Sequence, residues 1–415
     1  MGSPKRWNST LNSNLTHIDD APSPAANAGK SSSALHLLTL TPFFPSAGDE
    51  VRGCFIAESL EQLKQQNVDS SVIAASPLHY PRKTPASFAP AEWVRYPQLP
   101  GNLGLSSAGK LLYARLLGRV RRLHAERKID LIHAHAALPC GHAAMLLSRR
   151  LNIPFVVTLH GLDVFNAGFL GGKPAEWRRE VSIDIYREAR VVICISEKVQ
   201  QLLKSGMPKD VRSTVVYNGT DTQLFSPGPA AVEPRPKEIL IVGNLLRGKG
   251  HELVLQTIGK LKPVHPELQC RIIGEGPDRA RFAELAKTLG IEQQVQFLGQ
   301  QSRSQVADAM RRCTILALPS RYEGLGCVYL EAMACAKPVI ACRGQGIDEI
   351  IEHGRNGWLI PVDGLNELVQ GLRTLLDSPE LCARIGLAAR ETIVGKLTLS
   401  HQARQLAKIY GEAIA

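Results

Sequence analysis

Two glutamates stand on either side of a glycine turn in the stretch PSRYEGLGCVYLEAMACAKPVIA, residues 319–341. Glu331 follows Glu323 by eight positions, which along an α-helix is about 12 Å, the span of a nucleotide diphosphate. One carboxylate could therefore accept hydrogen bonds from the hydroxyls of a sugar, and the other from those of a ribose. Between them, the turn of Gly324, Leu325 and Gly326 would let the backbone approach a ligand, and the N–H groups of the following helix would suit a phosphate.

The plain alternative is that both glutamates are solvated on a surface helix, as an arbitrary pair would be in about nine cases of ten. The surroundings favour a site instead. Glu323 follows the apolar run 314–319, which predicts a buried strand. Glu331 lies inside an apolar helix predicted over 327–335, and a second buried strand is predicted over 338–342. Strand, turn, helix and strand in this order form half of a nucleotide-binding βαβ unit.

Further candidates surround the same predicted sheet. Lys249 and Gly250 precede a predicted helix, and a lysine beside a helix N-terminus is a sound ligand for a diphosphate. Arg247 lies in the same loop. Gly274 and Glu275 follow the apolar run of CRIIGEGPDR, in a tight turn of the kind that approaches a nucleotide, although such glycines can equally be plain loop formers.

In the first half of the chain, histidines and an aspartate follow apolar runs. His160 and Asp163 lie near the end of IPFVVTLHGLDVF, and His133 and His135 lie within IDLIHAHAALPCG. Ligands of open parallel sheets bind beyond the carboxyl ends of the strands, so His160 and Asp163 fall where chemistry is expected. A histidine in such a place is more often structural, and we interpret His133 and His135 in this way. Gly53, after the first predicted strand, is a weak candidate for a phosphate contact because no GxGxxG pattern accompanies it.

The elements that must position these residues form two α/β domains. Residues 1–33 lack hydrophobic periodicity and are rich in Ser, Asn, Ala and Pro, which predicts a disordered leader. Apolar runs alternating with amphipathic stretches predict one Rossmann-like domain over 34–226 and a second over 238–396, with a proline-rich linker over 227–237. Residues 397–415 are predicted to form a terminal helix.

Two stretches of the first domain could form its ligand- or lipid-binding surface. Residues 77–104 are rich in proline and predicted to be an irregular connection that could shape a ligand site. The predicted helix over 110–128 carries seven basic groups, with Leu112, Leu116 and Val120 on one face. Such a helix could rest on anionic lipid. The alternative, which we favour, is that its apolar face packs on the sheet while the arginines are solvated.

Composition limits the class of protein. Hydrophobic residues make up 44% and charged residues 21% of the 415 residues, as in soluble globular proteins. No apolar run reaches the length of a membrane span, and the N-terminus lacks the apolar core of a secretory signal, which predicts a cytoplasmic protein. The nine cysteines are scattered without a CxxC pair, so buried reduced thiols are expected and a zinc site is not.

The net charge of +11 would suit nucleic acid, anionic lipid or phosphorylated substrates. The chain shows no zinc-finger pattern, no RNP-type aromatic strand and no arginine-rich tail. Nucleic acid is therefore the weakest of the three partners.

The glutamate pair, the run EAMACAKPVIA, Glu349 and NGW at 356–358 together resemble the donor-site signature of family 4 glycosyltransferases. The resemblance extends over nearly the whole chain from residue 35 and includes KG at 249–250 and TLHGLD around His160. It implies the GT-B fold, in which two Rossmann-like domains with parallel sheets face each other across a deep cleft and a terminal helix crosses back to the first domain. It also implies retaining transfer of a sugar from a UDP- or GDP-linked donor to an acceptor hydroxyl.

By this resemblance Glu323 would hold the donor sugar, Glu331 the ribose, and His160 the sugar from the opposite domain, and no metal would be required. The other residues implied are Gly53, Lys249, Arg247, Gly274, Glu275, Gly324, Leu325 and Gly326 on the donor side, and His135 and Asp163 on the acceptor side. Two positions depart from the family. Asn244 replaces the usual arginine, which removes one diphosphate contact unless Arg247 replaces it, and Ala336 replaces a glycine, where a methyl group is expected only to tighten the end of the helix.

The pattern HAHxALPxG with TLHGLDV resembles the branch that builds cell-envelope polysaccharides more than it resembles the glycogen synthases. A saccharide or lipid-linked acceptor and a place on the inner face of the cell membrane are therefore expected. Two alternatives on the same architecture are a sugar-nucleotide epimerase, which should not carry this glutamate pair, and a nucleotide-sugar-binding protein that has lost catalysis, which Asn244 leaves open. Glycoside hydrolysis is disfavoured because its two carboxylates would have to lie about 5 to 10 Å apart.

Overall fold

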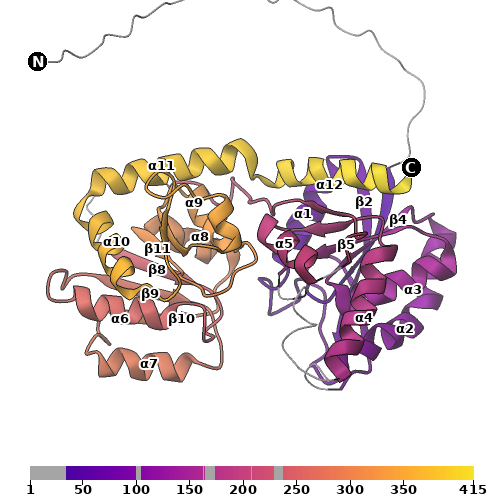
Figure 1. Cartoon of the computed structure of the whole chain (residues 1–415), viewed down its shortest axis with the longest axis horizontal. Helices are drawn as coiled ribbons and strands as arrows, with labels where there is room; N and C mark the ends of the chain where they lie inside the picture. The colour runs from indigo at the N-terminus through magenta and orange to yellow at the C-terminus, as the bar shows by residue number, and fades with distance from the viewer. Residues whose placement is uncertain (1–33, 100–103, 162, 164–172, 207, 229–236) are drawn as a thin grey trace, which may run out of the picture. The chain divides into compact units, whose positions relative to one another are not determined.

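The apolar runs of the sequence form two parallel β-sheets with helices between their strands (Figure 1). The computed structural model describes residues 34–99, 104–161, 163, 173–206, 208–228 and 237–415. The predicted leader over 1–33 and residues 229–236 of the predicted linker lie outside the described residues. Ala34–Ala415 form one compact unit, which contains both sheets.

The first sheet has the strand order β3-β2-β1-β4-β5-β6-β7, and all its neighbouring strands are parallel. Its strands are β1 (Leu35–Thr41), β2 (Val68–Pro77), β3 (Glu92–Tyr96), β4 (Leu131–His135), β5 (Phe155–Leu159), β6 (Val192–Cys194) and β7 (Ser213–Val215). Between them lie α1 (Cys54–Lys64), α2 (Leu105–Glu126), η1 (Ala137–Gly141), α3 (His142–Leu151), α4 (Lys173–Glu188) and α5 (Glu197–Gly206). The central strands β4 and β5 are buried along their whole length, as is typical of a parallel sheet covered by helices.

The second sheet has the order β10-β9-β8-β11-β12-β13 and is also parallel. Its strands are β8 (Glu238–Val242), β9 (Gln269–Ile273), β10 (Val295–Gly299), β11 (Ile315–Ala317), β12 (Val339–Cys342) and β13 (Trp358–Ile360). Its helices are α6 (His251–Leu261), α7 (Arg279–Thr288), α8 (Arg303–Arg312), α9 (Cys327–Ala334), η3 (Gly346–Glu349), α10 (Leu365–Asp377) and α11 (Pro379–Lys396). The predicted α/β class with two Rossmann-like sheets is confirmed.

In both sheets the strand order reverses in the middle. The chain runs outward from β1 to β3 and then returns to place β4 on the other side of β1, and it repeats this path with β8, β10 and β11. The loops after the two central strands diverge at such a reversal and leave room for a ligand. In this chain those loops lead to Gly53 after β1, the residues beyond His135 after β4, Lys249 after β8 and Glu323 after β11.

The last helix, α12 (Leu399–Ile414), packs on the first sheet although it follows the second one in sequence (Figure 1). Its side chains Leu406 and Tyr410 join a buried cluster with Leu37 of β1 and Leu131 of β4. The terminal helix thereby ties the end of the chain to the first domain.

The prediction for residues 77–104 was wrong in part. They contain the edge strand β3, which pairs with β2 and buries Val94 and Tyr96. The prolines around it suggested a loop, but they flank the strand rather than interrupt it. Helix α2 begins at Leu105, earlier than predicted.

The apolar face of α2 packs inward, as the favoured interpretation had it. Leu112, Leu116 and Val120 are fully buried in the core of the first domain. Arg119, on another face, pairs with Glu92 of β3. The hydrophobic side of this helix is therefore used for folding.

The expectation for Ala336 was also wrong. This residue follows α9 with a φ of 56°, in the left-handed region that glycine enters without strain and other residues enter at a cost of roughly 1–2 kcal/mol. The methyl group therefore strains the end of α9 instead of tightening it.

Candidate active site

The turn between β11 and α9 is fixed by backbone geometry and by neighbouring polar groups. Gly326 precedes α9 with a φ of 82°, and a Cβ at this position would lie 2.5 Å from the ring of Tyr329. The backbone N–H of Glu323 donates to Oε1 of Gln345 at 3.0 Å, and the carbonyl of Glu323 accepts from the N–H of Gly346 at 3.1 Å. Among the described residues no side chain caps α9, so the first N–H groups of this helix can receive an anionic ligand.

Glu323 pairs with Lys249 across the switch point of the second sheet. The Lys249 Nζ lies 2.7 Å from Oε2 of Glu323, and the Glu323 side chain is only 15% exposed. Lys249 lies just before α6, whose N-cap Gly250 has a φ of 85° and approaches Pro319 so closely that a Cβ would lie 2.6 Å from its carbonyl oxygen. The loops after β8 and β11 are therefore packed together, with a cation beside the first acid.

Glu331 lies on α9 and is 6% exposed, so it is a buried acid rather than a solvated one. Its Oε1 accepts a hydrogen bond from Nη1 of Arg303, the first residue of α8. Glu323 precedes the helix, which begins at Cys327, so the helical rise used to estimate a span of about 12 Å applies only to part of the interval. The two acids nevertheless lie at opposite ends of one turn-and-helix segment, each beside a cation.

Three histidines of the first domain form a row, in which His133 and His135 are buried and His160 is half-buried. His160 Nε2 lies 3.0 Å from His135 Nδ1, and the two rings stack at 5.2 Å. The rings of His135 and His133 lie 4.3 Å apart, and His133 Nδ1 lies 2.9 Å from the hydroxyl of Tyr410 on α12. Burial lowers the pKa of His160 to about 3, so this ring is neutral at physiological pH. Its hydrogen bond to His135 sets the ring orientation.

The loop of His160 contacts the turn that carries Glu323. A Cβ on Gly324 would lie 3.0 Å from the carbonyl oxygen of His160, and one on Gly161 would lie 3.3 Å from Cα of Gly324. The hydroxyl of Ser196 donates to the carbonyl of Gly324 at 2.6 Å. The structure therefore brings predicted residues of both domains into one place.

Asp163 supports this loop through the backbone. Its two carboxylate oxygens accept from the N–H of His160 at 2.9 and 3.1 Å. His135 likewise contacts His160 rather than open solvent, since it is only 7% exposed. Both predicted acceptor-side residues thus lie around His160.

The remaining predicted positions lie at glycine turns or apart from the acids. Gly53 precedes α1 with a φ of 76°, and a Cβ there would lie 2.5 Å from the carbonyl oxygen of Phe43. Gly274 has a φ of 138°, and a Cβ there would lie 2.0 Å from the carbonyl oxygen of Gly243, while the carbonyl of Glu275 accepts from the N–H of Leu245 at 3.0 Å.

Arg247 is directed elsewhere. Its side chain is 76% exposed and pairs with Asp278 at 3.5 Å, not with the turn of Glu323. Its proposed contact with a diphosphate in place of the arginine that the family has at position 244 stays a prediction.

Several residues of the site escaped the sequence analysis. Arg303, Glu58 and Gln345 touch the predicted site residues or their partners, and each is far from them in sequence. One signal was available for Arg303. It follows the capping serine of a helix, where acids are favoured, so a basic residue there is unusual.

All nine cysteines are free, and eight of them are buried, as predicted. Burial raises the pKa of the Cys54 thiol to about 12.

Of the helices in the described ranges, none has the length and apolar character to cross a membrane.

Two family profiles match adjoining parts of the chain: Glycosyltransferase Family 4 over residues 55–224 and Glycosyl transferases group 1 over residues 227–392. An uncharacterized glycosyltransferase of Methanocaldococcus jannaschii, MJ1178, is 31% identical over 63% of this chain and 70% of that protein. The D-inositol 3-phosphate glycosyltransferase of Corynebacterium glutamicum is 28% identical over 79% of this chain and 80% of that protein. Anabaena Alr3699/HepE, crystallised in complex with UDP-glucose, has a TM-score of 0.72 at 20% identity, over 91% of this chain and 100% of that chain.

The two sheets, their switch points and the returning terminal helix define a protein of the GT-B class. The chain belongs to the family 4 glycosyltransferases, and it is an enzyme of that kind.

Proposed function

We propose that this enzyme transfers a sugar, with retention at the anomeric carbon, from a nucleotide-diphosphate sugar to an acceptor hydroxyl. The observation that carries the proposal is the pair of acids on the turn and helix α9, the half-buried Glu323 and the buried Glu331, each beside a cation. Glu323, next to the loop of His160, would hold the donor sugar, and Glu331 would accept from the ribose hydroxyls. His160 would contact the sugar from the first domain.

The leaving diphosphate would be stabilised without a metal. Lys249 supplies a positive charge, and the N–H groups of the 324–326 turn and the N-terminus of α9 supply oriented dipoles. These groups are held in place before the reaction by the contacts of the turn with Gln345 and Ser196. Such preorganisation favours the developing negative charge, and contact between the domain loops would keep out water, which competes with the acceptor.

For the donor, a uridine nucleotide has the best support, because the similar Anabaena structure contains UDP-glucose. A GDP-linked donor is the other candidate. For the acceptor we propose a saccharide or lipid-linked saccharide of the cell envelope, at the inner face of the membrane. Support comes from the likeness of the HAHAALPCG and TLHGLDV segments to that branch of the family.

Contact with an anionic membrane would use the outward face of α2. Its apolar face is buried, so this contact would be electrostatic, through exposed residues such as Lys110 and Arg122. Binding to vesicles with anionic lipid that weakens with added salt would support it, and equal binding to neutral vesicles would count against it.

The test of the proposed function is a thermal-shift panel with UDP, GDP, ADP and their common sugar conjugates. A ligand of the folded state raises the unfolding temperature by mass action, so one nucleotide is expected to stabilise the wild type and to lose its effect in Glu331→Ala. Glu352→Ala is a control, because Glu352 is an exposed acid that pairs with Arg355 in its own segment. No shift with any nucleotide would refute the proposal.

A further inference from the structure

Arg303 is the first residue of α8, at a helix end that favours negative charge. The helix does not need it for capping. Ser302 accepts from the backbone N–H of Gln305, and the Gln305 side chain accepts from the N–H of Ser302. The charge of Arg303 is unfavourable for α8 itself, so its role must come from the groups that its side chain contacts.

The guanidinium of Arg303 joins one acid from each domain. Its Nε and Nη2 donate to Oε1 of Glu58 on α1 at 3.0 and 2.6 Å, while Nη1 donates to Glu331 on α9. Its Cζ lies 4.7 Å from the ring centre of the fully buried Phe225. With a side chain that is 18% exposed, Arg303 is a largely buried cation held on several sides.

The two acids depend on this cation. Burial raises the pKa of Glu58, and the charge of Arg303 opposes that rise. Burial acts to lower the pKa of Arg303, but Glu331 and Glu58 outweigh it and raise that pKa above its ordinary value. Without the arginine, the half-buried Glu58 and the buried Glu331 would have no cation between them.

The bond from Arg303 also leaves Glu331 able to bind a ligand. A carboxylate offers about four acceptor positions, and the guanidinium uses one of them, on Oε1. The arginine therefore fixes the carboxylate without saturating it.

We propose that Arg303 is a positioning residue for ribose recognition, orienting Glu331 toward the ribose hydroxyls while Glu58 anchors Arg303 from the first domain. The inference rests on the proposed role of Glu331 toward the donor ribose. It makes the first domain a participant in recognising the nucleotide half of the donor, which would otherwise be left to the second domain. It also predicts that the effect of Arg303 depends on the ribose hydroxyls of the ligand.

The experiment compares UDP with 2′,3′-dideoxy-UDP by isothermal titration calorimetry. In Arg303→Met, the affinity for UDP should fall about tenfold, the effect of losing one charge-assisted hydrogen bond, while the affinity for dideoxy-UDP should change less than about twofold. The double variant Arg303→Met with Glu58→Gln removes one cation and one anion together, so that one acid instead of two is left without the cation, which lowers the risk of unfolding. It should show the same dependence on the hydroxyls.

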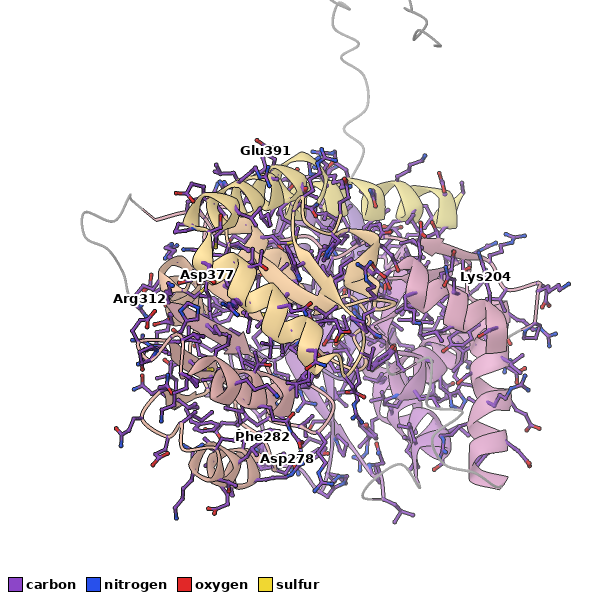
Figure 2. All side chains as sticks on the ribbon, turned by 60° about the vertical axis from the view of Figure 1, so that its left-hand side comes forward. Lys204, Asp278, Phe282, Arg312, Asp377 and Glu391 are labelled. Atoms are coloured by element: carbon purple, nitrogen blue, oxygen red, sulfur yellow. The ribbon has the colours of Figure 1, made fainter. Side chains whose placement is uncertain are left out.

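Arg312→Met is the matched control, because Arg312 is an exposed arginine at the other end of α8 (Figure 2). It should bind both nucleotides like the wild type. An equal loss of affinity for both nucleotides in Arg303→Met would overturn the proposal and indicate general electrostatics. No loss of affinity for either nucleotide would also overturn the proposal, and would mean that Arg303 only forms an ion pair between the domains.

These results are distinct from failure of the proposed function, in which the wild type itself would bind neither UDP nor GDP. If only GDP binds, the same comparison is made with GDP and dideoxy-GDP.

Discussion

At the scale of single residues, each acid of the site pairs with a basic side chain from another segment of the chain. Lys249 accompanies Glu323, and Arg303 accompanies Glu331. Each basic side chain fixes its carboxylate in place, and each carboxylate keeps further acceptor positions for the hydroxyls of a ligand.

The row of histidines makes stability depend on pH. Burial lowers the pKa of both His133 and His160 to about 3, whereas an unfolded histidine titrates near about 6.5. Above about pH 6.5 neither state is protonated. As the pH falls below that value, the unfolded state binds protons that the folded state does not, so the free energy of unfolding decreases by about 1.4 kcal/mol per pH unit for each such histidine.

Urea unfolding of the wild type and His160→Gln at pH 7.5 and pH 5.5 measures this effect. The variant lacks one of the histidines and should lose less stability between the two values, by up to about 1.4 kcal/mol. Identical losses in the two proteins would mean that His160 is protonated in the folded state.

At the scale of elements, helix α5 of the first domain is capped by a residue of the second. Glu349 accepts from the backbone N–H groups of Glu197 and Lys198 at 2.8 and 2.6 Å, and from the hydroxyl of Tyr217 at 3.0 Å. A carboxylate at a helix N-terminus is favourable both as an acceptor and as a charge. The contact lies beside Ser196, whose hydroxyl holds Gly324.

Glu349→Ala is expected to lower the free energy of unfolding by about 1–3 kcal/mol, because three donors lose their acceptor. Tyr217→Phe should have a smaller effect, since it removes one hydrogen bond only. Glu352→Ala, on the same segment, serves as the control. Equal midpoints for Glu349→Ala and the control in urea would contradict a capping role.

The elements were predictable where the sequence pattern is local. Continuous apolar runs predicted strands such as β5 and β12, and the glycine turn before α9 followed from its composition. Strand β3 was missed because its five residues, EWVRY, include two charged ones without a regular alternation and lie among prolines. The strain at Ala336 could not be seen either, since it depends on the φ that the end of α9 imposes.

At the scale of the whole molecule, the site is assembled by contacts between residues far apart in the chain. The resemblance to a known family indicated Glu323, Glu331, Lys249 and His160, and the strand order explains why their loops meet. The resemblance did not indicate the ion pair between Glu58 and Arg303, which are 245 positions apart in the sequence. Such a pairing has no periodicity and becomes visible only in the folded chain.

If the two acids bind opposite ends of one donor, replacing Glu323 should affect the sugar end alone, and calorimetry on Glu323→Gln measures this. The ligands are the nucleoside diphosphate that stabilises the wild type and its sugar conjugate. The variant should bind the nucleoside diphosphate about as tightly as the wild type does and the sugar conjugate about tenfold more weakly, because only the sugar would contact Glu323. Equal weakening for both ligands, or for neither, would contradict the placement of the donor sugar at Glu323.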